Sequence, residues 1–352
     1  MKDAMKLVFI LPASGRTGGI RSTVVASNLL LERGHRVRIL YRKAPKTLRD
    51  LYRSVVIPLL YRGNHDWLHT FKGRIHSFKD ISGCSFEDGE VIVGAGIQAS
   101  RLIMDLESIP NPKLLYLHGE NVTKPKETEK VLKSPLPKIV VSSLLKPMVE
   151  SHGGKVLGIV ANGVDRHEYY NSVNDSEKDG IGMIYASHLS KDPGTTLAVL
   201  ERLSKQKPQL PIRVFSPHRR PKAIKRKSFW RLPSIEKVRE IYSRSKVWIL
   251  ASRSEGFGIP ILEAMACGCA IVATDCGGPR DIIRDGKNGF IVEIGNVQKI
   301  VDRVLMLIND DNLRERICME AKKTVEEFSW DRAADKLEEV LKRLASPQCA
   351  EL

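Results

Sequence analysis

Two glutamates bracket the part of the chain whose residue types are best suited to chemistry. Glu255 and Glu263 flank a glycine-rich stretch, 256–260, which follows an apolar run and opens a helical pattern. Its glycines let a ligand approach the backbone closely and leave N–H groups free to donate. The helix start adds further unpaired N–H groups and a positive dipole end, which suit phosphates and hydroxyls. A carboxylate that accepts hydrogen bonds from two neighbouring hydroxyls is a natural clamp for a sugar or a ribose.

A simpler interpretation is that the two glutamates only complement the positive end of the helix. Each would then stabilise the fold by roughly 0.3–1 kcal/mol. This interpretation accounts for one acidic residue. It does not account for two glycines, an aromatic residue and a second glutamate placed in order around one turn, so we favour a ligand site.

The first half of the chain alternates strand and helix patterns. Residues 5–11 read as a buried strand, 14–19 as a glycine-rich turn, 20–32 as an amphipathic helix and 36–41 as a second strand. This order forms a βαβ unit, which implies a parallel sheet. Apolar runs at 91–94, 114–117, 139–141 and 156–159 fit the same doubly wound sheet.

The pattern restarts after the polar segment 171–180, which we interpret as an interdomain linker. Strands are expected at 181–186, 212–215, 247–251, 270–274 and 289–292, with helices at 195–204, 235–243 and 259–266. The remainder, 297–344, has a helical pattern. We therefore predict two Rossmann-like domains, 1–170 and 181–328, followed by a helix and tail, 329–352.

Several short motifs match one known family. They are the Glu-x7-Glu pair of Glu255 and Glu263, the runs 255–258, 262–268 and 277–279 around it, the 162–165 turn, Gly18-Gly19, and Ser329-Trp330. On these motifs the chain resembles the retaining glycosyltransferases of family 4, over nearly its whole length and thinly between Tyr41 and Leu114. The resemblance implies the GT-B fold: two doubly wound parallel-sheet domains facing across a cleft, with the last helix packing back on the first domain.

The resemblance also implies roles for individual residues. The implied donor-binding residues are Gly18, Gly19, His188, Lys191, Glu255, Gly256, Phe257, Gly258, Ile259 and Glu263, and the implied catalytic residues are His118, Glu255 and Lys191. Glu263 would hold the ribose hydroxyls, Glu255 the transferred sugar, and the backbone N–H groups of 257–259 the sugar or diphosphate. His118 would lie beside the transferred sugar, although a lone histidine after a strand is also often structural.

One stretch departs from the family pattern. The family carries an Arg and a Lys for the diphosphate after the first strand of the second domain. Here His188 stands at the position of the Arg, and Lys191 precedes Gly194 by three residues instead of directly. We take Lys191 as the phosphate ligand. The sequence leaves open whether His188 and Lys191 together replace the usual pair.

Sugar transfer from a nucleotide donor leaves a nucleoside diphosphate, so donors around the phosphates are the main catalytic resource. The expected donor is a UDP- or GDP-sugar. No Asp-x-Asp triplet occurs in the chain, so we predict no catalytic metal and no other cofactor. Retention of configuration follows from the resemblance alone. Cys267, Cys269 and Cys276 have no fourth ligand at metal-site spacing, and we interpret them as small buried residues.

A formal net charge of +16 indicates an anionic partner without choosing its class. Basic residues alternate with apolar and aromatic ones over 42–79, which suits an anionic membrane surface and a glycan or lipid-linked acceptor, although a solvated face explains the run equally well. The basic run 213–231 lacks a nucleic-acid motif, so we expect a loop near the donor nucleotide or plain surface and no nucleic-acid partner.

The sequence also carries an expectation about location. No apolar run reaches membrane-spanning length, and 5–11 fits a first strand better than a signal peptide. A cytoplasmic protein, or one peripheral on the cytoplasmic face of the membrane, is therefore expected.

Two other function classes stay open. A GT-B-like sugar-nucleotide epimerase would bring extra acid–base carboxylates, and a phosphorylase a pyridoxal-phosphate lysine; neither stands out. A non-catalytic membrane- or RNA-binding protein would show no donor hydrolysis, and no loss of nucleotide binding on Glu263→Ala.

Overall fold

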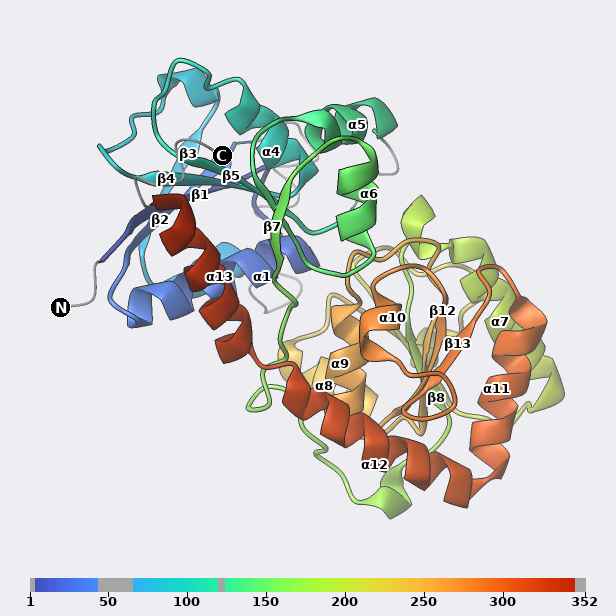
Figure 1. The fold of residues 1–352 in the computed structure, drawn as a ribbon. Coiled ribbons are helices and arrows are strands. Elements are labelled where there is room, and N and C mark those ends of the chain that lie inside the picture. The colour runs from blue at the N-terminus through green and yellow to red at the C-terminus, as the bar shows by residue number, and fades with distance from the viewer. Residues whose placement is uncertain (1–3, 44–65, 120–123, 346–352) are drawn as a thin grey trace. The chain divides into compact units, whose positions relative to one another are not determined.

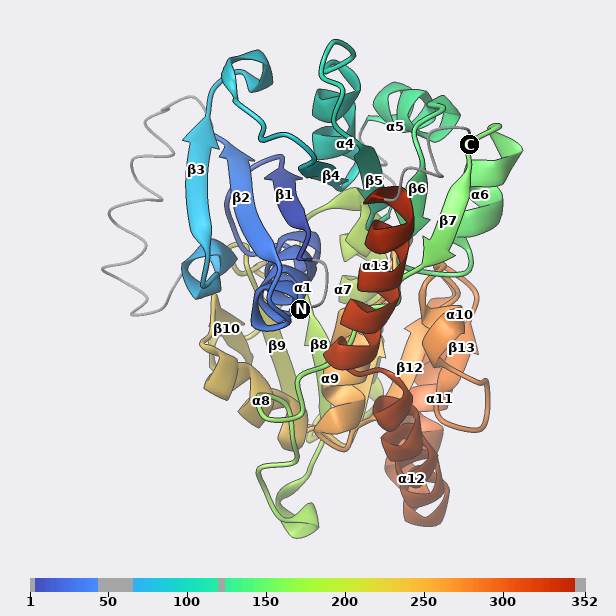
Figure 2. The same cartoon turned by 60° about the vertical axis from the view of Figure 1, so that its left-hand side comes forward.

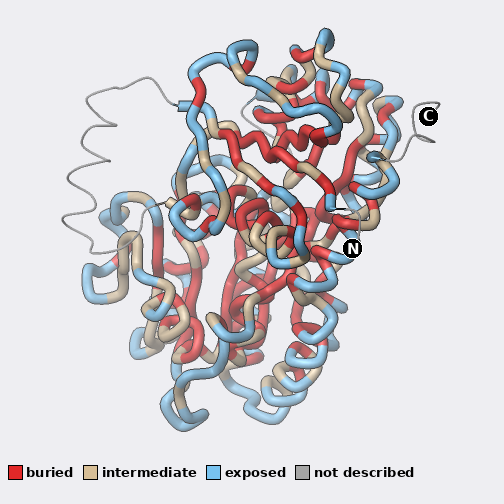
Figure 3. The backbone as a smooth tube through the Cα atoms, turned by 90° about the vertical axis from the view of Figure 1, so that its left-hand side faces the viewer, coloured by how far each residue is buried: buried red, intermediate tan, exposed pale blue. Residues whose placement is uncertain are grey.

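The computed structural model describes residues 4–43, 66–119 and 124–345. Contacts divide the chain into two compact units, Met1–Asn162 with Trp330–Leu352, and Gly163–Ser329. Each unit is built on one parallel sheet flanked by helices (Figure 1, Figure 2). Buried residues are concentrated in the strands of both sheets (Figure 3). The two predicted Rossmann-like domains are thus confirmed.

The first unit holds a seven-stranded sheet in the order β3-β2-β1-β4-β5-β6-β7. Its strands are β1 (Lys6–Leu11), β2 (Arg36–Arg42), β3 (Arg74–Phe78), β4 (Val91–Ala95), β5 (Lys113–Leu117), β6 (Lys138–Val140) and β7 (Val156–Ile159). Its helices are α1 (Gly18–Glu32), α4 (Ile97–Met104), α5 (Pro125–Lys133), α6 (Leu145–Ser151) and α13 (Trp330–Ala345), with short 3-10 turns η2 (Trp67–Thr70) and η3 (Ile81–Gly83). The order reverses between β1 and β4, so the loop after β1 begins at a topological switch point, where such sheets bind ligands.

The second unit holds a six-stranded sheet in the order β10-β9-β8-β11-β12-β13. Its strands are β8 (Ile181–Ile184), β9 (Ile212–Ser216), β10 (Phe229–Arg231), β11 (Val247–Leu250), β12 (Ala270–Thr274) and β13 (Phe290–Val292). Its helices are α7 (Pro193–Gln206), α8 (Ile235–Ser243), α9 (Ile259–Ala266), α10 (Pro279–Ile282), α11 (Val297–Asn309) and α12 (Asp311–Glu327), with 3-10 turns η4 (Asp175–Glu177), η5 (Leu189–Lys191) and η6 (Arg226–Ser228). Here the switch point lies between β8 and β11.

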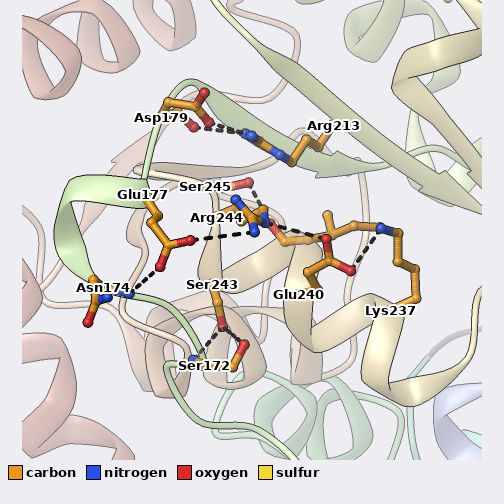
Figure 4. A network of polar contacts seen from close by, with 11 residues as sticks. Ser172, Asn174, Glu177, Asp179, Arg213, Lys237, Glu240, Ser243, Arg244 and Ser245 are labelled. Carbon is orange, nitrogen blue, oxygen red and sulfur yellow. Dashed lines mark hydrogen bonds and ion pairs between the residues drawn. The ribbon is translucent and has the colours of Figure 1, made fainter.

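Residues 171–180, which composition indicated as a linker, lie within the second unit. Ser172 donates through its hydroxyl to Ser243 Oγ at 3.1 Å, and Glu177 pairs with Arg244 at 3.6 Å (Figure 4). Asp179 pairs with Arg213 at the start of β9. Polar residues of this segment therefore bond to the C-terminal end of α8 and to β9, although most of them also face solvent. The unit boundaries fall at Asn162/Gly163 and Ser329/Trp330.

Helix α13 packs on α1 and β7 of the first unit, as expected for the last helix. Leu337, Val340 and Leu341 are fully buried there. Glu338 accepts a hydrogen bond from Arg33 Nη1 at 2.9 Å. An apolar stripe and a partly buried ion pair thus fix this helix to its own unit.

Two edge strands, β3 and β10, were not expected from the sequence. Most of their residues are exposed or half-buried. An edge strand needs no continuous apolar run, so the apolar pattern that reveals central strands is missing. Among the residues that the structure describes, no helix is long and apolar enough to span a membrane.

Candidate active site

The turn between β11 and α9 is held by the neighbouring loop after β12. The backbone N–H of Glu255 donates to Cys276 O at 2.8 Å, and Glu255 O accepts from Gly278 N at 3.0 Å. A Cβ at Gly278 would lie 2.2 Å from Phe257 Cα, so only glycine permits this close approach. The side chain of Glu255 is left only 9% exposed at the carboxyl edge of the sheet.

Glu255 and Lys191, both predicted for the site, lie in direct contact. Lys191 Nζ donates to Glu255 Oε1 at 2.5 Å, and Ser252 Oγ donates to the same oxygen at 2.7 Å. Lys191 comes from η5, after β8, and 28% of its side chain is exposed. The pair therefore joins the loops that follow the two strands at the switch point, with a cation facing solvent and a carboxylate below it.

The start of α9 has no side-chain cap within the described part of the chain. Gly258 occupies the N-cap position at φ 106°, ψ 41°, a left-handed conformation that favours glycine, and none of the described side chains caps it. Phe257 is 3% exposed, and its ring packs edge-on against Phe328 at 5.8 Å. Its ring is therefore part of the core, and only its backbone is suited to a ligand. Gly256 and Ile259 are half-buried in the same turn.

Glu263 lies one turn further along α9, and its described hydrogen bond is with a different residue from those that contact Glu255. It is 6% exposed, and Tyr242 Oη donates to its Oε2 at 3.0 Å. Tyr242 is fully buried among the rings of Trp248, Phe215 and Tyr169. Burial first, and the charge of Glu263 second, raise the pKa of Tyr242 well above its usual value. Tyr242 therefore stays a proton donor and holds the carboxylate of Glu263 in place.

Sequence reasoning missed Tyr242, because an aromatic residue on the apolar stripe of a helix is ordinarily core. The other missed contacts lie in the loop after β8. Asp192 adopts φ 41°, accepts a hydrogen bond from Thr195 N at 3.1 Å, and pairs with Arg253 Nη2 at 3.0 Å. No sequence signal indicated a left-handed aspartate there.

His188, expected beside Lys191, is exposed in the same loop, and its Nδ1 lies 2.9 Å from Ser190 Oγ. The structure thus places His188 on the same loop as Lys191. Among the described hydrogen bonds, Lys191 donates to Glu255, and His188 makes no bond with Glu255.

In the first unit, the predicted residues Gly19 and His118 lie side by side. A Cβ at Gly19 would stand 3.5 Å from His118 Cβ and Cγ. Gly18 and Gly19 form the first turn of α1, which Thr17 caps by accepting from Ile20 N at 3.4 Å. Together they place a helix start next to the imidazole of His118, the residue after β5.

The contacts of His118 indicate its tautomer. Thr23 Oγ1 donates its single proton to Gly19 O at 2.8 Å and lies 3.4 Å from His118 Nε2. The proton of the imidazole is therefore assigned to Nε2, which donates to Thr23. His118 Nδ1 is buried with no hydrogen-bond partner among the described residues. Desolvation lowers the pKa of His118 to about 4, so the ring is neutral near pH 7 and offers an acceptor.

The three neighbouring cysteines behave as the sequence indicated. Cys267, Cys269 and Cys276 are buried, and Cys269 Sγ donates to Tyr242 O at 3.0 Å. Burial raises the pKa of the Cys267 and Cys276 thiols to about 12. They remain thiols at neutral pH and fill space around the turn from α9 to β12.

Part of the second unit matches a known family model. Residues 224–324 match the family model described as glycosyl transferases group 1. An uncharacterized glycosyltransferase of Methanocaldococcus jannaschii is 32% identical over 112 residues, which are 32% of this chain and 32% of that protein. The N-acetyl-alpha-D-glucosaminyl L-malate synthase of Bacillus anthracis is 30% identical over 106 residues, 30% of this chain and 28% of that protein. The match thus spans about a third of the length of these curated relatives.

Comparison with solved structures covers nearly the whole chain. TarM of S. aureus superposes with a TM-score of 0.75 at 12% identity, over 96% of this chain and 99% of that one. HepE of Anabaena, in complex with UDP-glucose, gives a TM-score of 0.71 at 16% identity, over 96% and 99%. At these identities the likeness concerns the fold. By fold the chain is therefore a GT-B protein, and by sequence its residues 224–324 match the glycosyl transferases group 1.

Proposed function

We propose that this protein is a glycosyltransferase, which moves a sugar from a nucleotide-sugar donor to a hydroxyl group of its acceptor. The family match at 224–324 and the glycosyltransferase names of the relatives support this proposal. The observation that carries it is the contact of Lys191 with Glu255 at the carboxyl edge of the six-stranded sheet, beside the uncapped start of α9. This arrangement would offer a cation, a carboxylate and the backbone N–H groups of an uncapped helix start to one ligand.

In the second unit we assign each group to one part of the donor. The diphosphate would be bound by Lys191, by the helix start at Gly258 and Ile259, and by the exposed His188. Glu255 would accept hydrogen bonds from hydroxyls of the transferred sugar. Glu263, oriented by Tyr242, would accept from the ribose hydroxyls. Because Glu255 and Glu263 have separate hydrogen-bond partners, each can bind its own part of an elongated ligand.

In the first unit we assign His118 to hydrogen bonding with a substrate hydroxyl. Its buried Nδ1 lacks a partner among the described residues and carries a lone pair in the assigned tautomer. The neutral ring would orient a hydroxyl without placing a competing positive charge nearby. Gly18 and Gly19 would leave room for that substrate beside the ring, together with the first-turn N–H groups of α1.

The chemistry follows from where charge develops. As the bond between the anomeric carbon and the diphosphate oxygen breaks, negative charge grows on the diphosphate and positive charge on the sugar ring. Lys191 and the N–H groups at the start of α9 would stabilise the diphosphate, since preorganised donors gain strength as charge appears. We propose that no metal takes part and that the anomeric configuration is retained. HepE binds UDP and UDP-glucose, which favours a UDP-sugar over a GDP-sugar for this chain.

For the acceptor we propose a glycan or lipid-linked hydroxyl, and for the protein's surroundings an anionic membrane surface. Most of the basic segment behind this idea, 44–65 of 42–79, lies outside the described residues. Within the second basic run, six Lys and Arg residues between 219 and 227 are exposed. Co-sedimentation with anionic vesicles at low salt tests the idea, and equal binding to neutral vesicles would remove it.

A binding panel tests the donor proposal. Thermal shift is measured with UDP-, GDP-, ADP-, dTDP- and CMP-sugars, on the wild type and on Glu263→Ala. We expect one donor class to stabilise the wild type and to lose that effect in the variant, and EDTA to leave turnover of that donor unchanged. Tyr242→Phe is the matched second variant, because it removes only the hydroxyl that orients Glu263. A panel in which no sugar nucleotide shifts the wild type would contradict the proposal.

A further inference from the structure

Two consecutive residues of one site loop form opposite ion pairs with the other site loop. Lys191 pairs with Glu255 at 2.5 Å, and Asp192 pairs with Arg253 at 3.0 Å. The backbone completes the contact, because the N–H groups of Arg253 and Ser254 donate to Ser190 O at 2.8 and 3.1 Å.

The loop that carries Lys191 has little apolar packing of its own. Leu189, the only large apolar side chain of η5, is 69% exposed. The three residues of η5 are followed at once by Asp192, whose φ of 41° and ψ of 69° are rare for a residue with a side chain. Such a conformation persists only where its surroundings hold it. Polar contacts must therefore fix the end of η5 and, with it, the position of Lys191.

Asp192 is held from two sides. Its Oδ1 accepts from Thr195 N at 3.1 Å and caps α7, and its Oδ2 accepts from Arg253 Nη2. The carboxylate is 10% exposed, whereas 63% of the Arg253 side chain faces solvent. The cap ties Asp192 to its own helix, and Arg253 alone of these partners ties it to the loop after β11.

We propose that Arg253 is a positioning residue for the diphosphate. It holds the left-handed turn at Asp192, and this turn sets the direction in which Lys191 leaves the backbone. The proposal rests on the proposed function, because it takes Lys191 as the phosphate ligand. Arg253 itself does not touch the phosphates in this scheme, so its effect passes through Lys191.

The experiment compares a ligand that has the phosphates with one that lacks them. Isothermal titration measures the binding of UDP and uridine, and of GDP and guanosine as a second pair, to the wild type and to variants. Arg253→Met is expected to weaken binding of the diphosphate about tenfold and to leave binding of the nucleoside unchanged. Arg253→Lys, which keeps the charge, should recover part of the loss. Asp192→Asn keeps the cap on Thr195 and should reproduce the loss.

A double-mutant cycle separates positioning from direct contact. In a Lys191→Met background, Arg253→Met should cause no further loss of diphosphate binding. Arg213→Met is the matched control, because Arg213 pairs with Asp179 at the opposite edge of the same sheet. It should leave the ratio of diphosphate to nucleoside binding as in the wild type.

The outcomes separate this inference from the proposed function. Additive losses in the cycle would show Arg253 on the phosphates and overturn the positioning role. An unchanged ratio in Arg253→Met would overturn it as well, while the proposed function stands. A wild type that binds none of the four ligands would refute both.

Discussion

Ion pairs lie at both the amino and the carboxyl ends of the strands of the six-stranded sheet, and we call these two sides of the sheet its amino and carboxyl edges. The pairs at the two edges differ in what surrounds them. At the amino edge, Asp179 pairs with Arg213, and Glu177 with Arg244, in a network that joins a surface segment to α8 and β9 (Figure 4). At the carboxyl edge, Lys191 pairs with Glu255 beside an uncapped helix start. The first set fastens elements together. The second fastens two loops and leaves 28% of the Lys191 side chain exposed.

The seven-stranded sheet repeats this contrast. At its amino edge, Arg38 of β2 donates to Glu90, the residue before β4, at 2.7 Å. At its carboxyl edge, His118 keeps a buried nitrogen that has no partner among the described residues. Buried polar groups ordinarily have a hydrogen-bond partner, and this nitrogen is the one that we propose for a substrate hydroxyl. In both sheets, the polar groups at the amino edge bond to one another, and those at the carboxyl edge include the residues that we propose for ligand binding.

The largest effect that would test this contrast is expected at Glu255. Glu255→Gln keeps the shape of the side chain and removes its charge, so it no longer neutralises Lys191. We expect release of nucleoside diphosphate from the donor to fall by about 10²–10³-fold. Asp179→Asn likewise removes the charge of a paired carboxylate, here at the amino edge, and should leave turnover near the wild-type rate. Equal activity in the two variants would contradict the contrast.

A smaller loss is expected at His118. His118→Ala removes one hydrogen bond to a substrate hydroxyl and should lower turnover by about tenfold. Burial lowers the pKa of His118 from 6.5 to about 4, so the ring stays neutral as the pH falls from 8 to 6. The pH profile of wild-type activity should therefore have no step near pH 6.5 that comes from His118, and the profile of His118→Ala should have the same shape. A titration at that pH, absent from the variant, would refute the neutral assignment.

Sequence patterns predicted most of this arrangement because the central strands and the glycine turns are local features. The apolar runs indicated β1 and β11, and the turn after β11 indicated Glu255. The contact of Lys191 with Glu255 joins residues 64 positions apart, and only the resemblance suggested that they share a ligand. The side-by-side placement of Gly19 and His118 likewise depends on the strand order β1-β4-β5.

Other features could not be predicted, since tertiary contacts decide them. The segment 171–180 has the composition of a solvated linker, and its partners on α8 and β9 are known only from the fold. Tyr242 has the pattern of an ordinary core residue, and its hydrogen bond to Glu263 depends on how α8 packs on α9. The left-handed turn at Asp192 is held by Arg253, far along the chain.

At the amino edge of the first unit, a change in stability is expected instead of a change in catalysis. Lys342 and then Arg33 lower the pKa of Glu338 from 4.5 to about 2. A carboxyl whose pKa is lowered by folding stabilises the fold above its unfolded value, and this stabilisation is lost as the pH falls from 4.5 toward 2. Glu338→Gln should lower the free energy of unfolding at pH 7 by roughly 2 kcal/mol. Urea titrations at several pH values measure the free energy of unfolding. Below pH 4.5 this free energy should fall less steeply with pH in the variant than in the wild type. Equal slopes in the two proteins would contradict a stabilisation by the lowered pKa of Glu338.

The smallest effect is expected at the exposed part of the Figure 4 network. Arg244 pairs with Glu177 at 3.6 Å and with Glu240 at 3.4 Å, and 38% of its side chain is exposed. Exposed pairs of this kind are screened by water and salt, so Arg244→Met should change the free energy of unfolding by about 0.5 kcal/mol or less. Nucleotide binding should not change, because the pair lies at the opposite edge from Glu255. Arg253→Met is the matched change at the carboxyl edge, where a loss of diphosphate binding with little change in melting temperature is expected. If Arg244→Met also weakened diphosphate binding, the two edges would not be separable, and ion pairs throughout the sheet would support the site alike.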